Sequence, residues 1–245
     1  MFGGSLRLFR LFGIQVSLHF SWFIVAAWMV STMSRRYESP IWGAYEYLAL
    51  FGIVLAHEFG HALACRQTRG RADDIILWPL GGVAFVSPPQ RPGAVLWSIV
   101  AGPLVNVALL PLLHILVVVA EQRAWMHTAP DAYTLIVGIN FINKAVLIFN
   151  LLPVYPLDGG QILRALLWFG IGRIRSLQVA SFVGVAGGVG LTVFGLLWLQ
   201  SIWFGILGFF VLSQALSGWQ QARALSAQLA EARRIRAEPP EPPVI

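Results

Sequence analysis

Charged residues are scarce in this sequence, and cysteine is almost absent. Asp, Glu, Lys and Arg make up 11% of the 245 residues, against about a quarter in a soluble domain, while hydrophobic residues reach 57%. This balance excludes an ordinary soluble globular protein and predicts a membrane protein embedded in the lipid bilayer. The single cysteine, Cys65, excludes an internal disulfide.

Lysine is also nearly missing, since Lys144 is the only one and arginine carries the remaining positive charge. A net charge of +6 can indicate nucleic-acid binding. Here, however, the arginines flank apolar runs, which is typical of membrane topology signals. We therefore expect no nucleic-acid partner.

Six apolar runs are long enough, or nearly so, to cross a hydrocarbon layer about 30 Å thick. They cover residues 14–33, 41–64, 95–120, 133–153, 179–199 and 202–218. The predicted fold class is an all-α polytopic membrane protein with about six transmembrane helices. Arg7 and Arg10 precede the first run, as in a signal peptide, but no clear small-residue cleavage pattern follows it. We expect that run to be a retained helix.

The arginines also predict which way the chain crosses the membrane. With the N-terminus inside, thirteen of the sixteen arginines fall in the inner segments and three in the outer loops. This bias predicts that both termini are cytosolic. Abundant Arg, Ala and Gly beside scarce Lys favour a prokaryotic plasma membrane.

Two segments between and after these runs have other patterns. Residues 74–87 contain two β-branched and aromatic stretches around Pro79–Gly82, which predicts a β-hairpin. Because it is apolar, we expect a membrane-associated hairpin or small sheet that other parts of the protein shelter. Residues 219–245 are polar and end in prolines. They predict a cytosolic tail, helical over residues 219–238 and then Pro-rich, either solvated or bound to a regulatory partner, after a six-helix membrane domain over 1–218.

The second apolar run contains His57-Glu58-Phe59-Gly60-His61, a His-Glu-x-x-His pattern. On a helix, positions i and i+4 share a face, so both imidazoles can bind one metal ion. Glu58 lies beside that face, where it can serve as a general base. Charged and imidazole groups are costly within a membrane, which makes them candidates for function.

Two histidines leave a catalytic zinc site one protein ligand short. Most acidic residues fall in loops or tails, whereas Asp158 follows the fourth apolar run within the segment Asn150–Gly160. Prolines at 153 and 156 interrupt the helix there, and two glycines after Asp158 allow a tight turn. Such a break can return a carboxylate to the helix bundle, so Asp158 is the candidate third ligand.

Taken together, His57–His61 and Asn150–Gly160 resemble the motifs of the site-2 protease family of intramembrane metalloproteases. Gly102–Asn106 resembles a further motif of the bacterial and archaeal members. The resemblance implies a catalytic core at about residues 41–170. It also implies one Zn²⁺ per chain, held by His57, His61 and Asp158, with Glu58 catalytic.

The same resemblance implies regulated intramembrane proteolysis of membrane-tethered protein substrates. It suggests that Asn150 holds the substrate backbone, and we place Asn106 and Gly82 with it among the substrate-binding residues. Gly82 belongs to the hairpin that resembles the family's membrane-associated sheet.

Other functions use some of the same residues. A membrane metal transporter or metal-binding protein could use the same three ligands, but it would not need a glutamate next to the first histidine. A non-catalytic scaffold usually has a damaged motif, and here no ligand or base is missing. A metalloprotease with a glutamate as third ligand is also conceivable. The role of Lys144, either lining a polar cavity or reaching to an interface, stays open.

Overall fold

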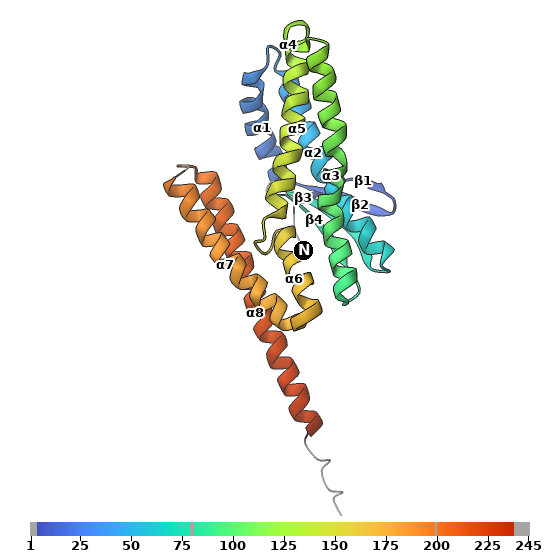
Figure 1. Cartoon of the computed structure of the whole chain (residues 1–245), viewed down its shortest axis with the longest axis vertical. Coiled ribbons are helices and arrows are strands. Elements are labelled where there is room, and N and C mark those ends of the chain that lie inside the picture. Colours follow the sequence, from blue (N-terminus) through green and yellow to red (C-terminus); the bar gives the residue numbers. More distant parts are fainter. Residues whose placement is uncertain (1–3, 79–80, 199, 238–245) are drawn as a thin grey trace, which may run out of the picture. The chain divides into compact units, whose positions relative to one another are not determined.

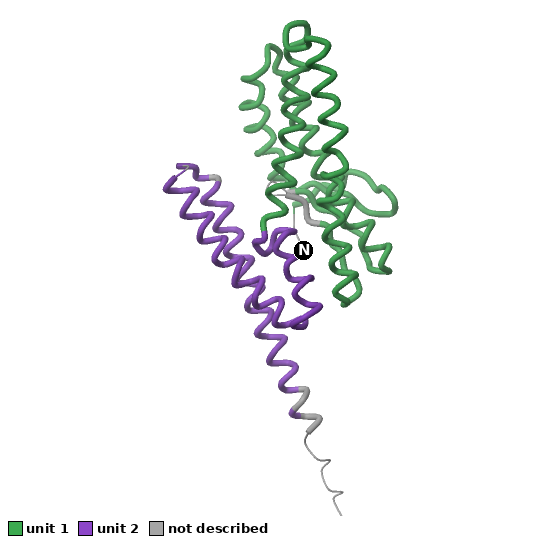
Figure 2. The backbone as a smooth tube through the Cα atoms, viewed as in Figure 1, with its two compact units in different colours: residues 1–152 green, residues 153–245 purple. Residues whose placement is uncertain are grey.

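The computed structural model describes residues 4–78, 81–198 and 200–237. It divides into two compact units, residues 1–152 and 153–245, which are distinguished in Figure 2. The boundary at residue 218 between membrane domain and tail stays a prediction. Each unit is described by itself below.

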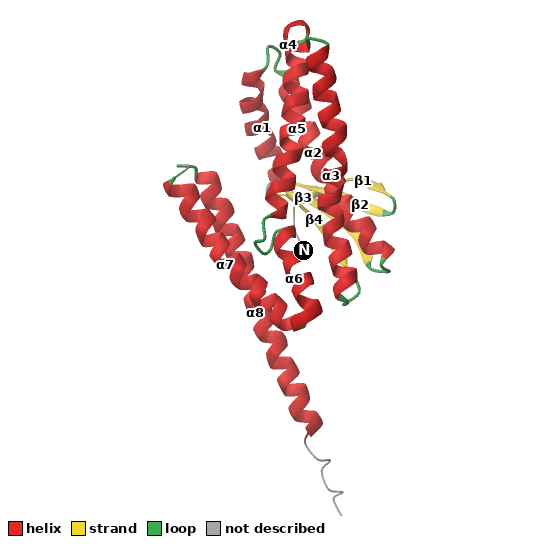
Figure 3. Ribbon diagram, viewed as in Figure 1, coloured by secondary structure: helices red, strands yellow, loops and turns green. Residues whose placement is uncertain are grey.

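The first unit contains a four-stranded mixed sheet, drawn in yellow in Figure 3. Its strands are β1 (Ser5–Leu11), β2 (Ile14–His19), β3 (Arg71–Trp78) and β4 (Gly81–Ser87), in the order β1-β2-β3-β4. The two hairpins are antiparallel, and β2 pairs with β3 in parallel. The predicted hairpin over 74–87 is therefore one half of a larger sheet.

The start of the predicted first helix is wrong, because Ile14–His19 is a strand. Phe12 and Gly13 turn the chain with positive φ angles of 50° and 73°, as expected for a two-residue hairpin turn. Ile14, Val16 and Leu18 are buried in one apolar core together with Trp22 and Phe59. Apolar and polar residues alternate strictly over Ile14–His19, which is the pattern of a strand, but this stretch was read together with the apolar residues after it as one helix.

The first unit also contains helices, of which the one over Ile41–Gln67 makes most of the contacts with the sheet. They are α1 (Ser21–Met33), the short η1 (Ser34–Arg36), α2 (Ile41–Gln67), α3 (Pro92–Gln122), α4 (Trp125–Thr128) and α5 (Pro130–Leu151). Helices α2, α3 and α5 contact one another, as can be followed in Figure 1. Gly60 permits the close approach of α2 and α3, since a Cβ there would lie 2.6 Å from the carbonyl oxygen of Ala101.

One face of α2 anchors it to the sheet. Phe59, Ala62 and Cys65, spaced three residues apart, are buried in the same apolar core as β2 and β3. At 3.6 residues per turn, the centre of this apolar face lies about a third of a turn around the helix from the face that carries His57 and His61. The apolar anchor thus fixes the orientation in which α2 presents its histidines.

The second unit is helical. It consists of α6 (Asp158–Ile171), α7 (Arg173–Leu197) and α8 (Ile202–Ala237). Helices α7 and α8 form an antiparallel pair in which Gly188 allows close contact, because a Cβ there would lie 2.8 Å from the Leu212 nitrogen. Helix α8 covers both the sixth predicted apolar run, residues 202–218, and most of the helix predicted over residues 219–238. Helix α6 was not predicted.

Among the described residues, four helices are long and apolar enough to cross a membrane: α2, α3, α5 and α7. The predicted count of six is not confirmed. Helix α1 has 13 residues, so at 1.5 Å per residue it extends about 20 Å, well short of a hydrocarbon layer. The mostly helical membrane architecture with a small sheet agrees with the predicted fold class.

Candidate metal centre and active site

The two histidines of the predicted motif meet inside the first unit. His57 and His61 lie one turn apart on α2, with 3% and 8% of their surface exposed. Their Nε2 atoms are 3.0 Å apart, and their rings stand edge to face. The motif is therefore assembled with both Nε2 atoms converging on one point.

The hydrogen bonds of the Nδ1 atoms define the tautomer of each ring. The Nδ1 of His61 lies 2.9 Å from the backbone carbonyl oxygen of Ser98, which can only accept, so this nitrogen carries the proton. The Nδ1 of His57 lies 2.6 Å from the Oδ1 of Asn106 and donates to it in the same way. Each Nε2 then holds a lone pair. Two such acceptors at this separation repel each other unless a cation lies between them, which fits a metal ion.

Helix α3 passes the histidines at Gly102, where it has no side chain. A Cβ at this position would fall on the ring of His61 at Nε2 and would lie 2.8 Å from the Nε2 of His57. The space in front of both Nε2 atoms therefore exists because residue 102 is glycine. A metal ion bound to both nitrogens, at about 2.0–2.1 Å from each, needs this space.

Glu58 lies next to the histidines and close to the sheet. It is 7% exposed, and its Oε2 accepts a hydrogen bond of 3.0 Å from the backbone N–H of Ala84 in β4. Since β4 is the last strand in the order of the sheet, this bond ties the candidate base to an edge strand. The sheet thus positions the carboxylate of Glu58 as well as the backbone of α2.

Asn106 has a different setting from the predicted one. The sequence analysis placed it among the substrate-binding residues, but it is fully buried and its Oδ1 contacts His57. Its Nδ2 donates to Asn143 on α5 at 2.8 Å. A side chain enclosed in this way is placed to orient the imidazole of His57. The packing of α3 against α2, which determines this contact, is not encoded in the local motif.

The remaining predicted site residues lie in three other elements. Asp158 is the first residue of α6, in the second unit. Asn150 is in the last turn of α5, where its Nδ2 donates to the Val146 carbonyl at 3.0 Å. Gly82 is in β4, opposite Leu77 of β3. Within the first unit, the structure brings together His57, Glu58 and His61.

Comparison with known proteins agrees with this arrangement. The sequence model of Peptidase family M50 matches residues 45–137 and 116–194, which together span more than half of the chain. The chain belongs to peptidase family M50. This confirms the resemblance to site-2 proteases noted from the motifs.

Two known relatives and one solved structure illustrate the similarity of this M50 chain. It is 31% identical to a zinc metalloprotease of Methanocaldococcus jannaschii over 198 residues, which are 81% of this chain and 56% of the relative. It is 36% identical to stage IV sporulation protein FB of Bacillus subtilis over 130 residues, 47% of this chain and 38% of the relative. The chain thus spans less than two thirds of these relatives.

The structure titled site-2 protease from Methanocaldococcus jannaschii is similar with a TM-score of 0.61 and 29% identity. The similarity covers 88% of this chain and 95% of that structure. Together with the zinc metalloprotease relative, it implies Zn²⁺ as the metal for the histidine pair of this M50 chain.

The M50 chain also contains a charged cluster around a buried glutamate, which the sequence analysis missed. Glu46 on α2 is 1% exposed, and the Nη2 of Arg36 lies 2.8 Å from both of its carboxylate oxygens. The hydroxyl of Tyr37 donates to Glu46 at 2.9 Å. Burial and the neighbouring carboxylate raise the pKa of Tyr37 above its ordinary value. The sequence signal that could have revealed the cluster is the position of Glu46 within the second apolar run, where a charged residue needs a partner.

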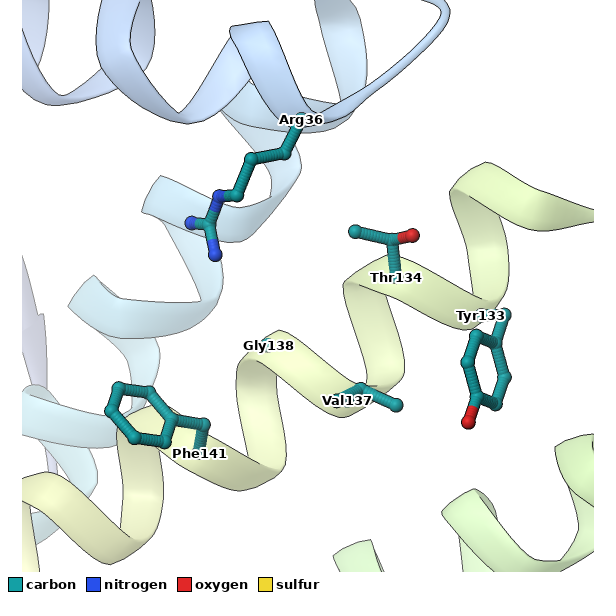
Figure 4. A pocket seen from close by; sticks show the side chains of 6 residues that line it. All are labelled: Arg36, Tyr133, Thr134, Val137, Gly138 and Phe141. Carbon is teal, nitrogen blue, oxygen red and sulfur yellow. The ribbon is translucent and has the colours of Figure 1, made fainter. Parts of the chain in front are cut away.

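A cavity of about 300 Å³ opens beside this cluster, as shown in Figure 4. Arg36 faces it from one side, and the other lining residues are on α5: Tyr133, Thr134, Val137, Gly138 and Phe141. A Cβ on Gly138 would lie 2.6 Å from Oε1 of Glu46, so the glycine makes room for the buried carboxylate. The hydrogen bonds of the cluster join Arg36 and Tyr37, which precede α2, to Glu46 within α2.

Proposed function

We propose that this chain is a membrane zinc metalloprotease that hydrolyses peptide bonds in or near the transmembrane segments of membrane-tethered proteins. The observation that carries the proposal is the pair of buried histidines, both in the tautomer that presents Nε2 to a metal, with Glu58 beside them. Membership of family M50 supports the same chemistry. Regulated intramembrane proteolysis is the process that such substrates imply.

Asp158 is the proposed third ligand of the zinc. A catalytic zinc site typically has three protein ligands, and a carboxylate oxygen is a suitable donor beside two imidazoles. Asp158 stands at the very start of α6, after an extended residue, Leu157. This places the carboxylate at a helix terminus, where a carboxylate is stabilised by the helix dipole. His57, His61 and Asp158 would then hold one Zn²⁺.

The mechanism assigns acid–base chemistry to Glu58. When bound to these residues, zinc supplies a Lewis acid that polarises a peptide carbonyl and lowers the pKa of water. Glu58 takes a proton from the attacking water and later passes it to the nitrogen of the leaving amine. The hydrogen bond from Ala84 holds one carboxylate oxygen of Glu58 in place, while the carboxylate remains next to the histidines.

The outer edge of β4 is the proposed binding surface for the unwound substrate. The N–H of Ala84 points toward Glu58, and therefore away from β3. Because backbone groups alternate along a strand, Gly82 and Val86 present their N–H and C=O groups on the same side. A substrate segment that adds to this edge as a strand would bring a peptide bond next to Glu58. Asn150, with an amide on the last turn of α5, is proposed to hold the substrate backbone.

Several finer features remain part of the proposal. The arginine distribution supports cytosolic termini in a prokaryotic plasma membrane. The polar end of α8 is exposed at Gln220, Gln221 and Arg223 among others, which suits a solvated helix or a regulatory partner. The last residues of the tail, 238–245, lie outside the described part of the chain.

The proposal is tested with purified protein in lipid vesicles together with a single-span test substrate. We expect cleavage that stops when a chelator removes zinc and returns when zinc is restored. A zinc-sensitive dye inside the same vesicles tests for transport. Zinc entry into the vesicles without cleavage of any single-span substrate would replace the protease proposal with a transporter.

A further inference from the structure

Two buried asparagines connect the metal ligand His57 to helix α5. Asn106 on α3 and Asn143 on α5 are both fully buried. The Nδ2 of Asn143 donates to the backbone carbonyl of Asn106 at 3.0 Å, and the Nδ2 of Asn106 donates to the Oδ1 of Asn143 at 2.8 Å. The Oδ1 of Asn106 in turn accepts from Nδ1 of His57 at 2.6 Å. The three side chains thus form one continuous hydrogen-bonded chain.

The direction of donation in this series of hydrogen bonds is fixed, because the series begins at a backbone carbonyl, which can only accept. The carbonyl of Asn106 requires the NH₂ group of Asn143, so the Oδ1 of Asn143 must face Asn106. That oxygen requires the NH₂ group of Asn106, so the Oδ1 of Asn106 must face His57. His57 must then carry its proton on Nδ1, which leaves its Nε2 lone pair for a metal.

We propose that Asn143 is a positioning residue for His57 and acts through Asn106. This inference rests on the proposed function, since it concerns the zinc ligand. Asn143 determines the amide orientation of Asn106, and Asn106 determines the tautomer and ring orientation of His57. Groups that orient a metal ligand in this way strongly affect metal affinity. Helix α5 thereby contributes to the metal centre without providing a ligand to it from this position.

Asn140 provides a matched control on the same helix. It lies three residues before Asn143 and is also buried, but its Oδ1 has no hydrogen-bond partner within the described residues. Asn140→Leu and Asn143→Leu make the same chemical change in the same helix. Only the second breaks the chain of hydrogen bonds to His57.

The first experiment measures zinc affinity of the full chain in detergent by competition with a chelator. We expect Asn143→Leu to weaken zinc binding by about 2- to 13-fold, the value of one hydrogen bond, and Asn140→Leu to leave it unchanged. Asn106→Leu should weaken it by about 10- to 100-fold. Adding Asn143→Leu to Asn106→Leu should cause no further loss, because the link is already broken. An equal loss in both backgrounds would overturn the proposal.

The second experiment needs no metal. ¹⁵N spectra of the imidazole groups in metal-free protein, above the pKa of histidine, report which ring nitrogen of His57 carries the proton. We expect Nδ1–H in the wild type and in Asn140→Leu, and a mixture of tautomers in Asn143→Leu. If Asn143→Leu does not fold, the smaller Asn143→Ala takes its place. A single Nδ1–H tautomer in the Asn143 variant would overturn the proposal.

The two measurements separate the failure of this inference from failure of the proposed function. A wild-type protein that binds no zinc, but shows the Nδ1–H tautomer that Asn143→Leu disturbs, would contradict the proposed function and leave the positioning role in place. If the wild type binds zinc and Asn143→Leu binds it with the same affinity, the positioning role alone is contradicted.

Discussion

Replacing Gly102 by alanine should remove zinc while leaving the helix bundle folded. The added Cβ would overlap Nε2 of His61 and would lie 2.8 Å from Nε2 of His57. The second distance is about 0.7 Å shorter than an ordinary van der Waals contact, and the carbon occupies the space that a metal ion needs. Either a ring must turn away or α3 must shift. We expect zinc affinity to fall at least about 100-fold. Losing a residue that only hydrogen-bonds to a metal ligand already costs about 10- to 100-fold, and here the position of the metal itself is obstructed.

Zinc content and chelator competition measure this loss, and thermal unfolding of the metal-free protein checks the fold. Alanine in a helix is otherwise favoured over glycine by about 1 kcal/mol, so the change is not expected to unravel α3 by itself. Gly52 on α2 is the matched control, since a Cβ there would meet nothing within 4 Å. Gly52→Ala should keep full zinc binding. Normal zinc affinity in Gly102→Ala would refute the location of the metal between His57, His61 and α3.

Three further predictions concern other parts of the structure. Glu46→Gln weakens the charged contact with Arg36, and it should lower the free energy of unfolding by roughly 1–3 kcal/mol without changing zinc affinity; unchanged thermal stability would contradict it. The pKa of Tyr37 is raised in the folded state, so the protonated hydroxyl contributes to the stability of the fold. This contribution is complete below the pKa of tyrosine in the unfolded chain, about 10, and is lost as pH rises from there through the folded-state pKa. Unfolding measured between about pH 8 and 11 should therefore show a steeper loss of stability in the wild type than in Tyr37→Phe. Gly82→Pro removes a backbone donor on the outer edge of β4, so cleavage should fall while zinc stays bound, and full cleavage would argue against strand addition.

The sequence predicted those elements whose signals are long and local. Three predicted spans correspond to α2, α3 and α5 within a few residues, since each is a long apolar run. The strand β2 was taken for the beginning of a helix, although its residues alternate between apolar and polar, because it runs with little interruption into the apolar residues of α1. Its partner β3 lies more than fifty residues later, so no pattern within either segment predicts that they pair.

The candidate site shows the same difference between local and distant information. His57, Glu58 and His61 could be predicted together because helical geometry places residues four positions apart on one face. The role of Asn106 could not, because it depends on how α3 crosses α2 and α5. Gly102 belongs to the motif Gly102–Asn106 noted in the sequence, but its place in front of the two Nε2 atoms could not be predicted, and neither could the contact of Asn143. Both depend on contacts between helices, which the spacing within one segment does not contain. Asp158 as third ligand stays a prediction.

The central claim is that Glu58 is the base of a zinc protease, and it is tested most directly by comparing the wild type with Glu58→Gln. Both proteins are loaded with zinc, their metal content is measured, and cleavage of a single-span substrate is followed in the same vesicles. We predict equal zinc content and at least about a 100-fold lower cleavage rate in the variant. Cleavage at the wild-type rate by zinc-loaded Glu58→Gln would contradict the account.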